Sequence, residues 1–524
     1  MKFQEYIKNK RSNIVLTNSQ EKAVKTVNDF LSDPFGPQCL IIKGGAGSGK
    51  TFIGSLIKEF LPDNTHIFTP TGRAANVARS MVSPDKRDSN ISTIHHGIFK
   101  PHSFTNHFID GKEKPENLTS AKAKFVLKEN VSPTDDLYIC DESSMISDVS
   151  NFSSDLEFGS GDLLADLFTF VGQRKLIFIG DNGQLTPIKM YKSPALDRKY
   201  LQMKFGVEVI ETELTEIIRQ KKGSGILFNA GKVRENIFHK ANHSSLDEFE
   251  DVKFGSEDDA IKTCVNMFEP DSFSNFTVVT HTRKKSHKYN ASIRAILFNN
   301  NSFITEGERL VCAQTNYKHD IWNGELMKVV KVYEDYDSRI SKLIKLAPTE
   351  RERRYYPDEI QEDGRIHVQL DYQKVDIEYH DASGHKEQST VYLILNALRS
   401  DSLALSPIEK RAHLVEFFIR QDISKKQYAK KLGKLKLTKV DVIDGIQSGK
   451  ILSNKNDEIY NSLIAKYGYS ITAHKAQGGE WEKAIVDFDT KFPDQTSTEY
   501  YRWLYTALTR AKNDLLIVNS NGYL

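Results

Sequence analysis

The sequence predicts an α/β protein with two parallel-sheet cores, the second of which is interrupted by a long insertion. Short apolar segments alternate with helical stretches through the first 190 residues, and similar segments return near residue 276 and after residue 466. Buried parallel strands covered by helices on both faces produce this pattern. Between about 303 and 450 the character changes to β-type segments with Asp-Gly and Ser-Gly turns, followed by a lysine-rich helical stretch.

The bulk composition is that of a globular protein of several domains. The chain has 524 residues, too many for one ordinary core, with 39% apolar and 27% charged residues. The net charge is only +2, so the protein as a whole does not attract polyanions. A polyanion such as a nucleic acid would have to bind at a local basic patch. No apolar run approaches the roughly 18–20 residues that span a bilayer, and the polar N-terminus lacks a signal-peptide apolar region. We therefore expect a cytoplasmic protein, in the host cytoplasm if it is viral, with no membrane partner.

The first core is expected to begin with a buried strand at 38–43, which ends in a glycine loop and leads into a helix from Lys50 to Phe60. A second strand at 65–70 precedes a helix rich in Ala and Arg. The segment 136–145 is an apolar strand followed by two acids. The segment 175–185 is likewise an apolar strand followed by polar residues.

Domain boundaries follow from these changes of pattern. Residues 97–130 interrupt the first core with aromatic residues and an Asp110-Gly111 turn signal, which indicates an inserted β-hairpin. The expected division is a first core at 1–221 (hairpin at 97–130), a second core at 222–302 and 462–524, and an insertion at 303–461.

A phosphate-binding loop, Gly44 to Thr51 (GGAGSGKT), lies between the first strand and the first helix, as such a loop requires. Its glycines let backbone N–H groups approach phosphates, and the helix N-terminus favours their charge. Lys50 should reach the β- and γ-phosphates, and the Thr51 hydroxyl should bind Mg²⁺. The expected nucleotide-binding positions of the loop are Gly45, Ala46, Gly47, Ser48, Gly49, Lys50 and Thr51.

Acidic and amide residues follow two further strands. Asp141 can hold Mg²⁺, and Glu142 can orient and deprotonate an attacking water. Gln184, in the segment Gly180 to Pro187 (GDNGQLTP), can sense the γ-phosphate. From side-chain chemistry and position alone, we expect Lys50, Asp141, Glu142 and Gln184 to be catalytic.

Together these elements resemble the superfamily 1 helicases, and more closely the RecD/Dda-like branch, superfamily 1B, which moves 5′ to 3′. The matching motifs occur in the expected order: the Q motif at 16–20, Ia at 70–75, Ib at 92–96, II at 141–142, III at 180–187, IV at 213–220, V at 472–478 and VI at 505–511. Two positions depart from common forms. Thr186 replaces the first of two prolines in motif III, and Arg73 follows the RecD form of motif Ia.

The resemblance implies roles for individual residues. Gln20 would read adenine, Glu480 would contact the ribose, and Arg219 and Arg510 would be arginine fingers from the second core. The fold implied is two RecA-like P-loop NTPase cores with a pin hairpin in the first. The turn Asn323-Gly324-Glu325 implies an SH3-like barrel, with a helical extension, in the insertion of the second core.

The resemblance also places a group of residues on DNA: Thr71, Arg73, Thr93, His95, Phe104, Phe108, Thr280, Thr472, His474 and Lys475. Two alternatives stay open. Thr93 and His95 could instead serve packing, and Phe104 and Phe108 could form a small hydrophobic cluster that holds the hairpin together rather than stack on a base.

A lysine run follows in the helical extension, at Lys425, Lys426, Lys430, Lys431, Lys434, Lys436 and Lys439. Such a run is usually a solvated face. The alternative is a surface that tracks phosphates.

The sequence therefore predicts a monomeric, ATP- and Mg²⁺-dependent 5′-to-3′ DNA helicase with DNA-stimulated ATP hydrolysis. Its expected partners are single-stranded DNA and single-strand/duplex junctions, with single-strand-binding, replication or recombination proteins as candidates. One alternative is a single-strand translocase or protein-displacing motor without robust unwinding. Another is the motor subunit of a recombination or nuclease complex. A degenerate binding protein is disfavoured because the catalytic residues are all present.

Overall fold

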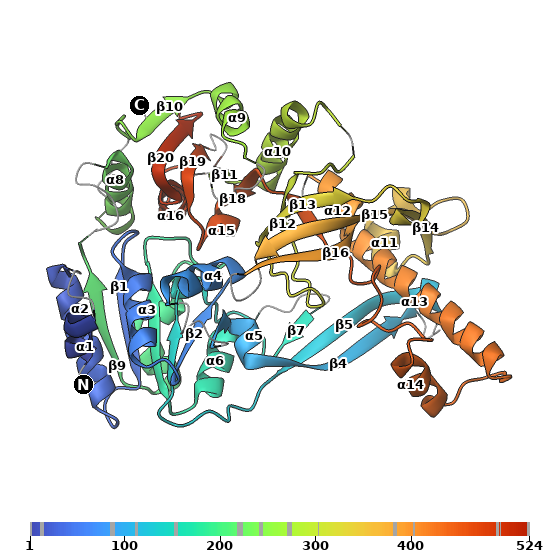
Figure 1. Cartoon of the computed structure of the whole chain (residues 1–524), viewed down its shortest axis with the longest axis horizontal. Coiled ribbons are helices and arrows are strands. Elements are labelled where there is room, and N and C mark those ends of the chain that lie inside the picture. The colour runs from blue at the N-terminus through green and yellow to red at the C-terminus, as the bar shows by residue number, and fades with distance from the viewer. Residues whose placement is uncertain are drawn as a thin grey trace.

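The chain folds into two parallel α/β cores, a third, antiparallel sheet and a small three-stranded sheet (Figure 1). The computed structural model describes residues 3–10, 15–83, 90–109, 114–150, 156–216, 224–239, 245–269, 275–301, 303–380, 385–401, 404–488, 492 and 494–520. The predicted α/β fold with two parallel-sheet cores is confirmed. None of the described helices combines the length and the apolar composition needed to cross a bilayer.

The first core is a six-stranded parallel sheet in the order β3-β2-β6-β8-β1-β9. Its strands are β1 (Cys39–Gly44), β2 (Thr65–Thr69), β3 (Ile91–Thr93), β6 (Leu137–Cys140), β8 (Lys175–Gly180) and β9 (Val209–Leu214). Its helices are α1 (Phe3–Lys10), α2 (Asn18–Ser32), α3 (Lys50–Phe60), α4 (Gly72–Met81), α5 (Ile94–Ile98), α6 (Leu163–Val171) and α7 (Arg198–Phe205). Successive residues of β1 enter different clusters, Leu40 with α2 and α3, and Ile41 with α6 and α7. Both faces of the sheet are therefore buried.

The second core is a five-stranded parallel sheet in the order β10-β20-β19-β11-β18. Its strands are β10 (Val252–Gly255), β11 (Phe276–Thr280), β18 (Ser470–Thr472), β19 (Trp481–Asp487) and β20 (Ala511–Val518). Its helices are α8 (Gly225–His239), α9 (Glu257–Asn266), α10 (Arg283–Leu297), α15 (Ala473–Ala476) and α16 (Thr498–Leu508). Segments from before and after the insertion pair in one sheet, so the insertion leaves the core continuous.

The third sheet has the order β14-β15-β13-β12-β17, and β16 also pairs with β15. Its strands are β12 (Arg309–Cys312), β13 (Leu326–Val332), β14 (Arg339–Leu346), β15 (Ile366–His380), β16 (Lys386–Ile394) and β17 (Ala465–Tyr467). The helices of this region are α11 (Glu350–Tyr355), α12 (Leu395–Arg399), α13 (Pro407–Lys431) and α14 (Lys439–Gln447). Because β17 pairs with β12, this sheet extends past the boundary expected at 461. Its assignment to the SH3-like class stays a prediction.

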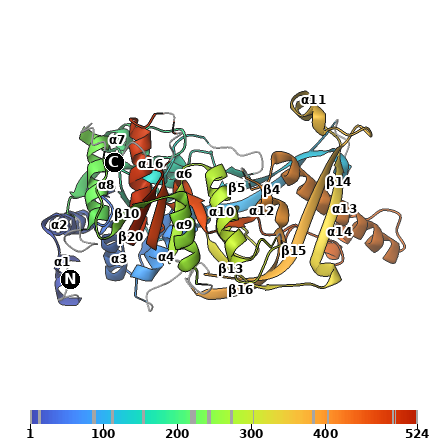
Figure 2. The same ribbon diagram turned by 90° about the horizontal axis from the view of Figure 1, so that it is seen from above.

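A long hairpin projects from the first core. Its strands β4 (Phe99–Phe108) and β5 (Leu118–Leu127) pair antiparallel, and β7 (Leu156–Phe158) adds to β5. The short helix η3 (Pro115–Asn117) precedes β5. The views in Figures 1 and 2 both place the far end of the hairpin beside α13 and the third sheet. The predicted turn at Asp110-Gly111 lies outside the described residues.

Candidate nucleotide site and nucleic-acid interface

The phosphate loop joins β1 to α3. Gly47 and Gly49 have positive φ angles of 74° and 90°, a conformation that glycine adopts without strain. A Cβ on Gly44 would lie 2.5 Å from Ser48 Oγ, so the tight turn also needs glycine there. Lys50 Nζ donates to the carbonyl oxygen of Gly45 over 2.8 Å, and its side chain is buried. The ammonium group is thus held against the loop.

The acidic pair follows β6 directly. Glu142 has a φ of 53°, an uncommon left-handed conformation for a residue with a side chain. Its backbone N–H donates to Asp141 Oδ1 over 2.8 Å. Burial raises the pKa of both carboxyl groups, while Lys50 lowers both. Glu142 Oε2 is buried without a hydrogen-bond partner, so this acid is poised to accept a proton or a polar ligand.

The residues expected to hold Mg²⁺ meet at one point. The Thr51 side chain and Lys50 both lower the pKa of Asp141, so a hydroxyl and a carboxylate lie near Lys50. Hard oxygen donors of this kind suit Mg²⁺, which uses one or two carboxylates together with substrate phosphates and water. The orphaned Glu142 oxygen lies on the same loop. The donor set therefore fits a magnesium ion, which would neutralise phosphate charge when bound.

Gln20 lies at the start of α2, in a capping box with Thr17. Its side-chain amide donates to the carbonyl oxygen of Ser48 over 3.0 Å, and its Oε1 accepts from the Thr17 N–H over 3.2 Å. Gln20 therefore joins α2 to the phosphate loop. Its expected contact with adenine stays a prediction, as does the ribose contact of Glu480, which is half-buried just after motif V.

The motif III loop is held from the second core. The hydroxyl of Thr506 accepts a hydrogen bond from the Leu185 N–H over 3.0 Å, and Arg502 donates to the carbonyl oxygen of Gln184 over 3.0 Å. Gln184 itself is buried, and its Oε1 has no hydrogen-bond partner. A buried amide oxygen without a partner is costly, so Gln184 is a candidate to contact water or substrate in the closed site.

The two predicted arginine fingers have different outcomes. Arg219 lies outside the described residues. Arg510 is buried and faces Glu142, but its donors are used within its own core. They bond to the carbonyl oxygens of Thr506, Ala476 and Gly479 and to the Thr509 hydroxyl. In this structure Arg510 is therefore not free to bind a phosphate without rearrangement.

Two second-core side chains to which the sequence motifs assign no role reach the nucleotide site. Arg234 Nη1 donates to Asp181 Oδ1 over 2.7 Å, and the Tyr505 hydroxyl donates to Asp181 Oδ2 over 2.8 Å. The Tyr505 oxygen also accepts from the Ala46 N–H over 2.8 Å. Tyr505 is the first residue of motif VI, so the motif match could have identified it as a residue of the site. Arg234 lies on a helix with several other charged residues, and no local pattern distinguishes it from them.

Arg73, expected on DNA, instead lies where three parts of the chain meet. Its Nη2 donates to the carbonyl oxygen of Gly324, in the turn before β13, over 3.1 Å, and its guanidinium stacks 4.7 Å from the Trp481 ring centroid in the second core. Burial lowers the pKa of Arg73 to about 10, although Glu325 raises it. Arg73 therefore joins the first core to its two neighbours, and a DNA contact by it stays a prediction.

At motif Ib, the structure separates adjacent histidines. The Thr93 hydroxyl accepts from the His96 N–H over 3.3 Å, and Thr93 is buried as the N-cap of α5. His95 packs 4.9 Å from the Phe158 ring centroid, and burial lowers its pKa to about 4. His96 is exposed. In this structure Thr93 and His95 therefore make packing contacts, as the alternative interpretation expected. His96 is the more accessible of the two imidazoles.

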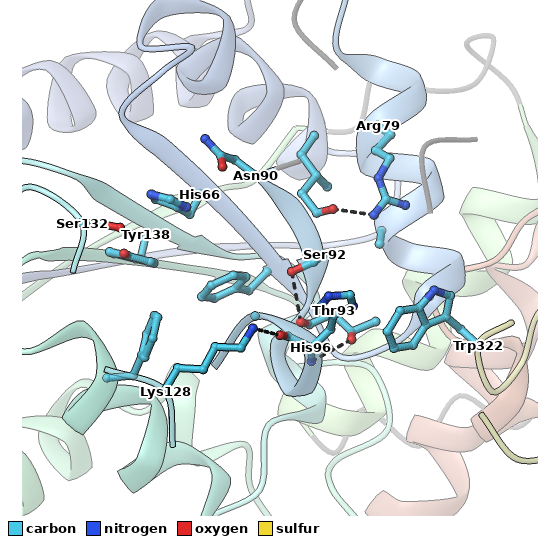
Figure 3. A pocket seen from close by; sticks show the side chains of 16 residues that line it. His66, Arg79, Asn90, Ser92, Thr93, His96, Lys128, Ser132, Tyr138 and Trp322 are labelled. Carbon is cyan, nitrogen blue, oxygen red and sulfur yellow. Dashed lines mark hydrogen bonds between the residues drawn. The ribbon is translucent and has the colours of Figure 1, made fainter. Parts of the chain in front are cut away.

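A cavity of about 400 Å³ opens beside His96 (Figure 3). Thr93, Arg79 and Lys128 line it from the first core, and Trp322 lines it from the connection between β12 and β13. The rings of His96 and Trp322 are 5.2 Å apart. A Cβ on Gly72 would lie 2.5 Å from Trp322 Cβ. The close approach of the third sheet therefore depends on glycine in motif Ia.

The remaining predicted DNA residues lie at the ends of strands. Thr71 caps α4 after β2 and accepts from the Ala74 N–H over 3.2 Å. Thr280 is buried at the end of β11 and donates to the carbonyl oxygen of Thr282 over 3.1 Å. Thr472 ends β18 and is half-buried. Next to it, His474 is exposed, whereas Lys475 is half-buried and its pKa is lowered by burial.

The far end of the hairpin is packed rather than free. Phe108 is half-buried against a cluster that contains Leu118, Tyr372 and Ala412. The Ala347 N–H donates to the carbonyl oxygen of Glu116 over 3.1 Å. The side chain of Phe104 lies outside the described residues. Phe108 therefore belongs to a hydrophobic cluster in this structure, as the alternative interpretation expected.

Two sequence families match the chain. The family described as AAA domain matches residues 20–189, a range that holds the phosphate loop, the acidic pair and Gln184. The family described as UvrD-like helicase C-terminal domain matches residues 467–518, from the end of the third sheet through β20. Residues 20–189 are therefore similar to an AAA domain, and residues 467–518 to a UvrD-like helicase C-terminal domain.

Similar proteins span nearly the whole chain. Uncharacterized protein R530 of Acanthamoeba polyphaga mimivirus is 22% identical over 521 residues, which cover 90% of this chain and 93% of the viral protein. A Pif1 helicase from Bacteroides, in complex with ADP-AlF3 and ssDNA, is 14% identical with a TM-score of 0.44, covering 98% of this chain and 95% of that chain. Pif1 helicase from Candida albicans is 16% identical with a TM-score of 0.42, covering 97% of each.

Proposed function

We propose that this chain, whose ordered motifs and two domain matches support a superfamily 1B helicase, is an ATP-dependent DNA helicase. It translocates 5′ to 3′ on single-stranded DNA and unwinds duplex, with DNA-stimulated hydrolysis of ATP. The polarity rests on the family resemblance.

One observation supports a motor above all: the nucleotide site draws on both cores. The Ala46 N–H of the phosphate loop bonds to Tyr505 of the second core, and Asp181 bonds to both Tyr505 and Arg234. A change of phosphate state at the loop therefore alters contacts between the cores. Relative movement of two domains around a ligand is a common way to convert binding energy into motion.

Within this site we assign the roles of Lys50, Thr51, Asp141, Glu142 and Gln184 from their chemistry, and those of Arg219, Arg510, Gln20 and Glu480 from the family resemblance. Lys50 binds phosphate, Thr51 and Asp141 hold Mg²⁺, and Glu142 accepts the proton of the attacking water. Gln184 senses the γ-phosphate. Arg219 and Arg510 stabilise charge on the transferring phosphoryl group, which for Arg510 requires release from its own core. Gln20 and Glu480 recognise the nucleoside.

The proposed DNA path crosses the carboxyl ends of the strands in both cores, where open parallel sheets bind ligands. Thr71 and Thr93 follow strands of the first core, and Thr472 ends a strand of the second. The exposed His96 and His474 lie next to these positions. The hairpin β4–β5 acts as the pin, and the third sheet holds it in place.

The deciding experiment is strand displacement with duplexes that carry a 5′ tail, a 3′ tail or no tail, in DNA and in RNA. The proposal predicts ATP-dependent unwinding of the 5′-tailed DNA. Unwinding from the 3′ tail alone would refute the assigned polarity. Translocation without unwinding would favour the single-strand translocase or protein-displacing motor. Unwinding that appears only with a co-purifying partner would favour a motor subunit of a larger complex rather than a monomer.

A further inference from the structure

We propose that Arg234 is a further positioning residue of the nucleotide site, which holds the second core on the phosphate loop through Asp181. Arg234 lies outside all the helicase-like motifs of this sequence. The inference rests on the proposed ATP hydrolysis and adds a residue and a role to it.

The Asp181 carboxylate collects hydrogen bonds from both cores. Its Oδ1 accepts from Arg234 Nη1 over 2.7 Å and from the Gly183 N–H over 2.8 Å. Its Oδ2 accepts from the Tyr505 hydroxyl over 2.8 Å. Asp181 is fully buried, and a buried carboxylate is stable only when it is paired and hydrogen-bonded. Two of the groups that stabilise this buried first-core carboxylate, Arg234 and Tyr505, therefore belong to the second core.

The charges favour an ionised Asp181. Burial raises its pKa, but the charges of Lys50 and Arg234 and the hydrogen bonds from Gly183 and Tyr505 together lower the pKa below its usual value. Lys50 belongs to the first core and Arg234 to the second, so the carboxylate lies between a cation from each core. By contrast, Arg510 uses its donors within the second core. Arg234 is therefore the second-core arginine that forms an ion pair with the motif III acid.

The network ends on the phosphate loop. The Tyr505 oxygen accepts from the Ala46 N–H over 2.8 Å. A Cβ built on Gly45 would lie 3.3 Å from the Tyr505 oxygen and 3.8 Å from Arg234 Nη1, so both groups lie at the surface of the loop. The Ala46 N–H has one proton to donate. A phosphate that takes this proton must displace the Tyr505 hydroxyl, and the pairing of Asp181 and Arg234 must then hold the cores together.

An arginine suits this place better than a lysine. Its Nη1 binds Asp181, while Nη2 lies 3.7 Å from Glu213 Oε1 of the first core. The guanidinium also lies 4.9 Å from the Phe238 ring centroid. A planar fork can serve these directions at once, whereas an ammonium group is a point charge. The Arg234 side chain is 25% exposed, so its guanidinium is partly accessible to solvent.

This role predicts that Arg234→Ala lowers the turnover rate but leaves nucleotide affinity nearly unchanged. The phosphate-binding groups of the loop, Lys50 and its backbone N–H groups, belong to the first core, so the Kd of the nucleotide should change less than about threefold in Arg234→Ala. Closure of the cores depends on the ion pair, so kcat of DNA-stimulated hydrolysis should fall by about tenfold to a hundredfold, as for loss of a charged hydrogen bond. Arg234→Lys should recover part of kcat.

The test measures kcat and KM with single-stranded DNA, and the Kd of a fluorescent ATP analogue without DNA. The variants are Arg234→Ala, Arg234→Lys, Asp181→Asn and the Arg234→Ala/Asp181→Asn double variant, with thermal melts to check folding. Lys232→Ala is the matched control, because this α8 lysine pairs with Asp247 at the surface and should leave kcat unchanged.

The inference requires that Arg234→Ala lose kcat but keep nucleotide affinity, and that its effect be non-additive with Asp181→Asn. Unchanged kcat in folded Arg234→Ala, or additive losses, would overturn it. If Arg234→Ala does not fold, Asp181→Asn must show the same split, because it removes the charge that pairs with Arg234. Wild-type protein without ATP hydrolysis would instead overturn the proposed function, and this inference with it.

Discussion

Arg411 Nε donates to the carbonyl oxygen of Leu118 over 2.6 Å and so binds helix α13 to the hairpin strand β5. Arg411 is buried, and its Nη1 pairs with Glu352 Oε2 over 2.6 Å. Phe108 and Leu118 pack into the same cluster as residues of α13 and the third sheet. The hairpin is thus connected to the insertion of the second core, so movement of that core would be transmitted to its far end.

This connection predicts the effect of Phe108→Ala. Truncation should loosen the hairpin from its cluster, since a partly buried aromatic ring contributes apolar contacts. Unwinding of a 5′-tailed duplex should fall severalfold more than DNA-stimulated ATP hydrolysis, which depends on the cores. The two rates should be measured on the same preparations, with exposed Phe35→Ala as the control. Equal losses of both activities would remove the pin role.

A second prediction concerns the phosphate loop. Lys50→Ala removes the ammonium group beside Gly45 and should lower kcat for ATP at least about a hundredfold, as expected for loss of a preorganised charge at the reacting phosphate. Single-stranded DNA binding, measured by fluorescence anisotropy without nucleotide, should stay within about twofold of wild type. Lys22→Ala, at an exposed position on α2, is the control. Residual turnover near the wild-type rate would show that another cation binds the phosphate.

How far the sequence predicts the site depends on whether the contacts are local. Helix α3 spans Lys50–Phe60 as expected, because the glycine loop, the strand before it and the helix after it are encoded within one short segment. The antiparallel pairing of β4 with β5 likewise follows from neighbouring residues. Local periodicity and loop chemistry suffice for such elements.

The destinations of long side chains are not local. Arg73 reaches Gly324 and Trp481, and Arg234 reaches Asp181, across boundaries between sheets that no sequence window contains. His95 and His96 are adjacent, yet one packs inside and the other is exposed, because successive helical residues point in different directions. Such placements depend on how the cores pack together, which a single sequence does not encode locally.

The lysine-rich end of α13 and α14 yields a third prediction. Lys426 pairs with Asp422 and Lys434 with Asp441, whereas Lys430, Lys431 and Lys436 are exposed. If these three contact phosphates, changing them to Glu should weaken binding of a tailed duplex. It should also reduce the slope of log affinity against log salt by about 0.9 for each lost contact.

The measurement is an anisotropy titration between about 50 and 200 mM salt. Lys22→Glu together with Lys25→Glu is the matched control, because both lysines are exposed on α2, in the first core and away from the insertion. A slope equal to that of wild type would favour the plain solvated face for this lysine cluster.

The last prediction concerns Glu325, at the turn that docks the third sheet on helix α4. Its carboxylate accepts hydrogen bonds from Asn76 Nδ2 over 3.2 and 3.3 Å. Burial raises its pKa from 4.5 to about 7, although Arg73 and Arg79 lower it. The folded state therefore favours the protonated form. The stability that this protonation contributes is fully present below about pH 4.5 and is lost as pH rises through about 7.

Glu325→Gln mimics the protonated side chain at every pH and should remove this component. The melting temperature of the variant should approach that of wild type at about pH 5 and rise relative to it by about pH 8. The free-energy difference should be on the order of a few kcal/mol, because one pKa unit is worth about 1.4 kcal/mol. Exposed Glu362→Gln should track wild type throughout. Parallel melting curves for Glu325→Gln and wild type across this range would show that Glu325 stays ionised between Arg73 and Arg79.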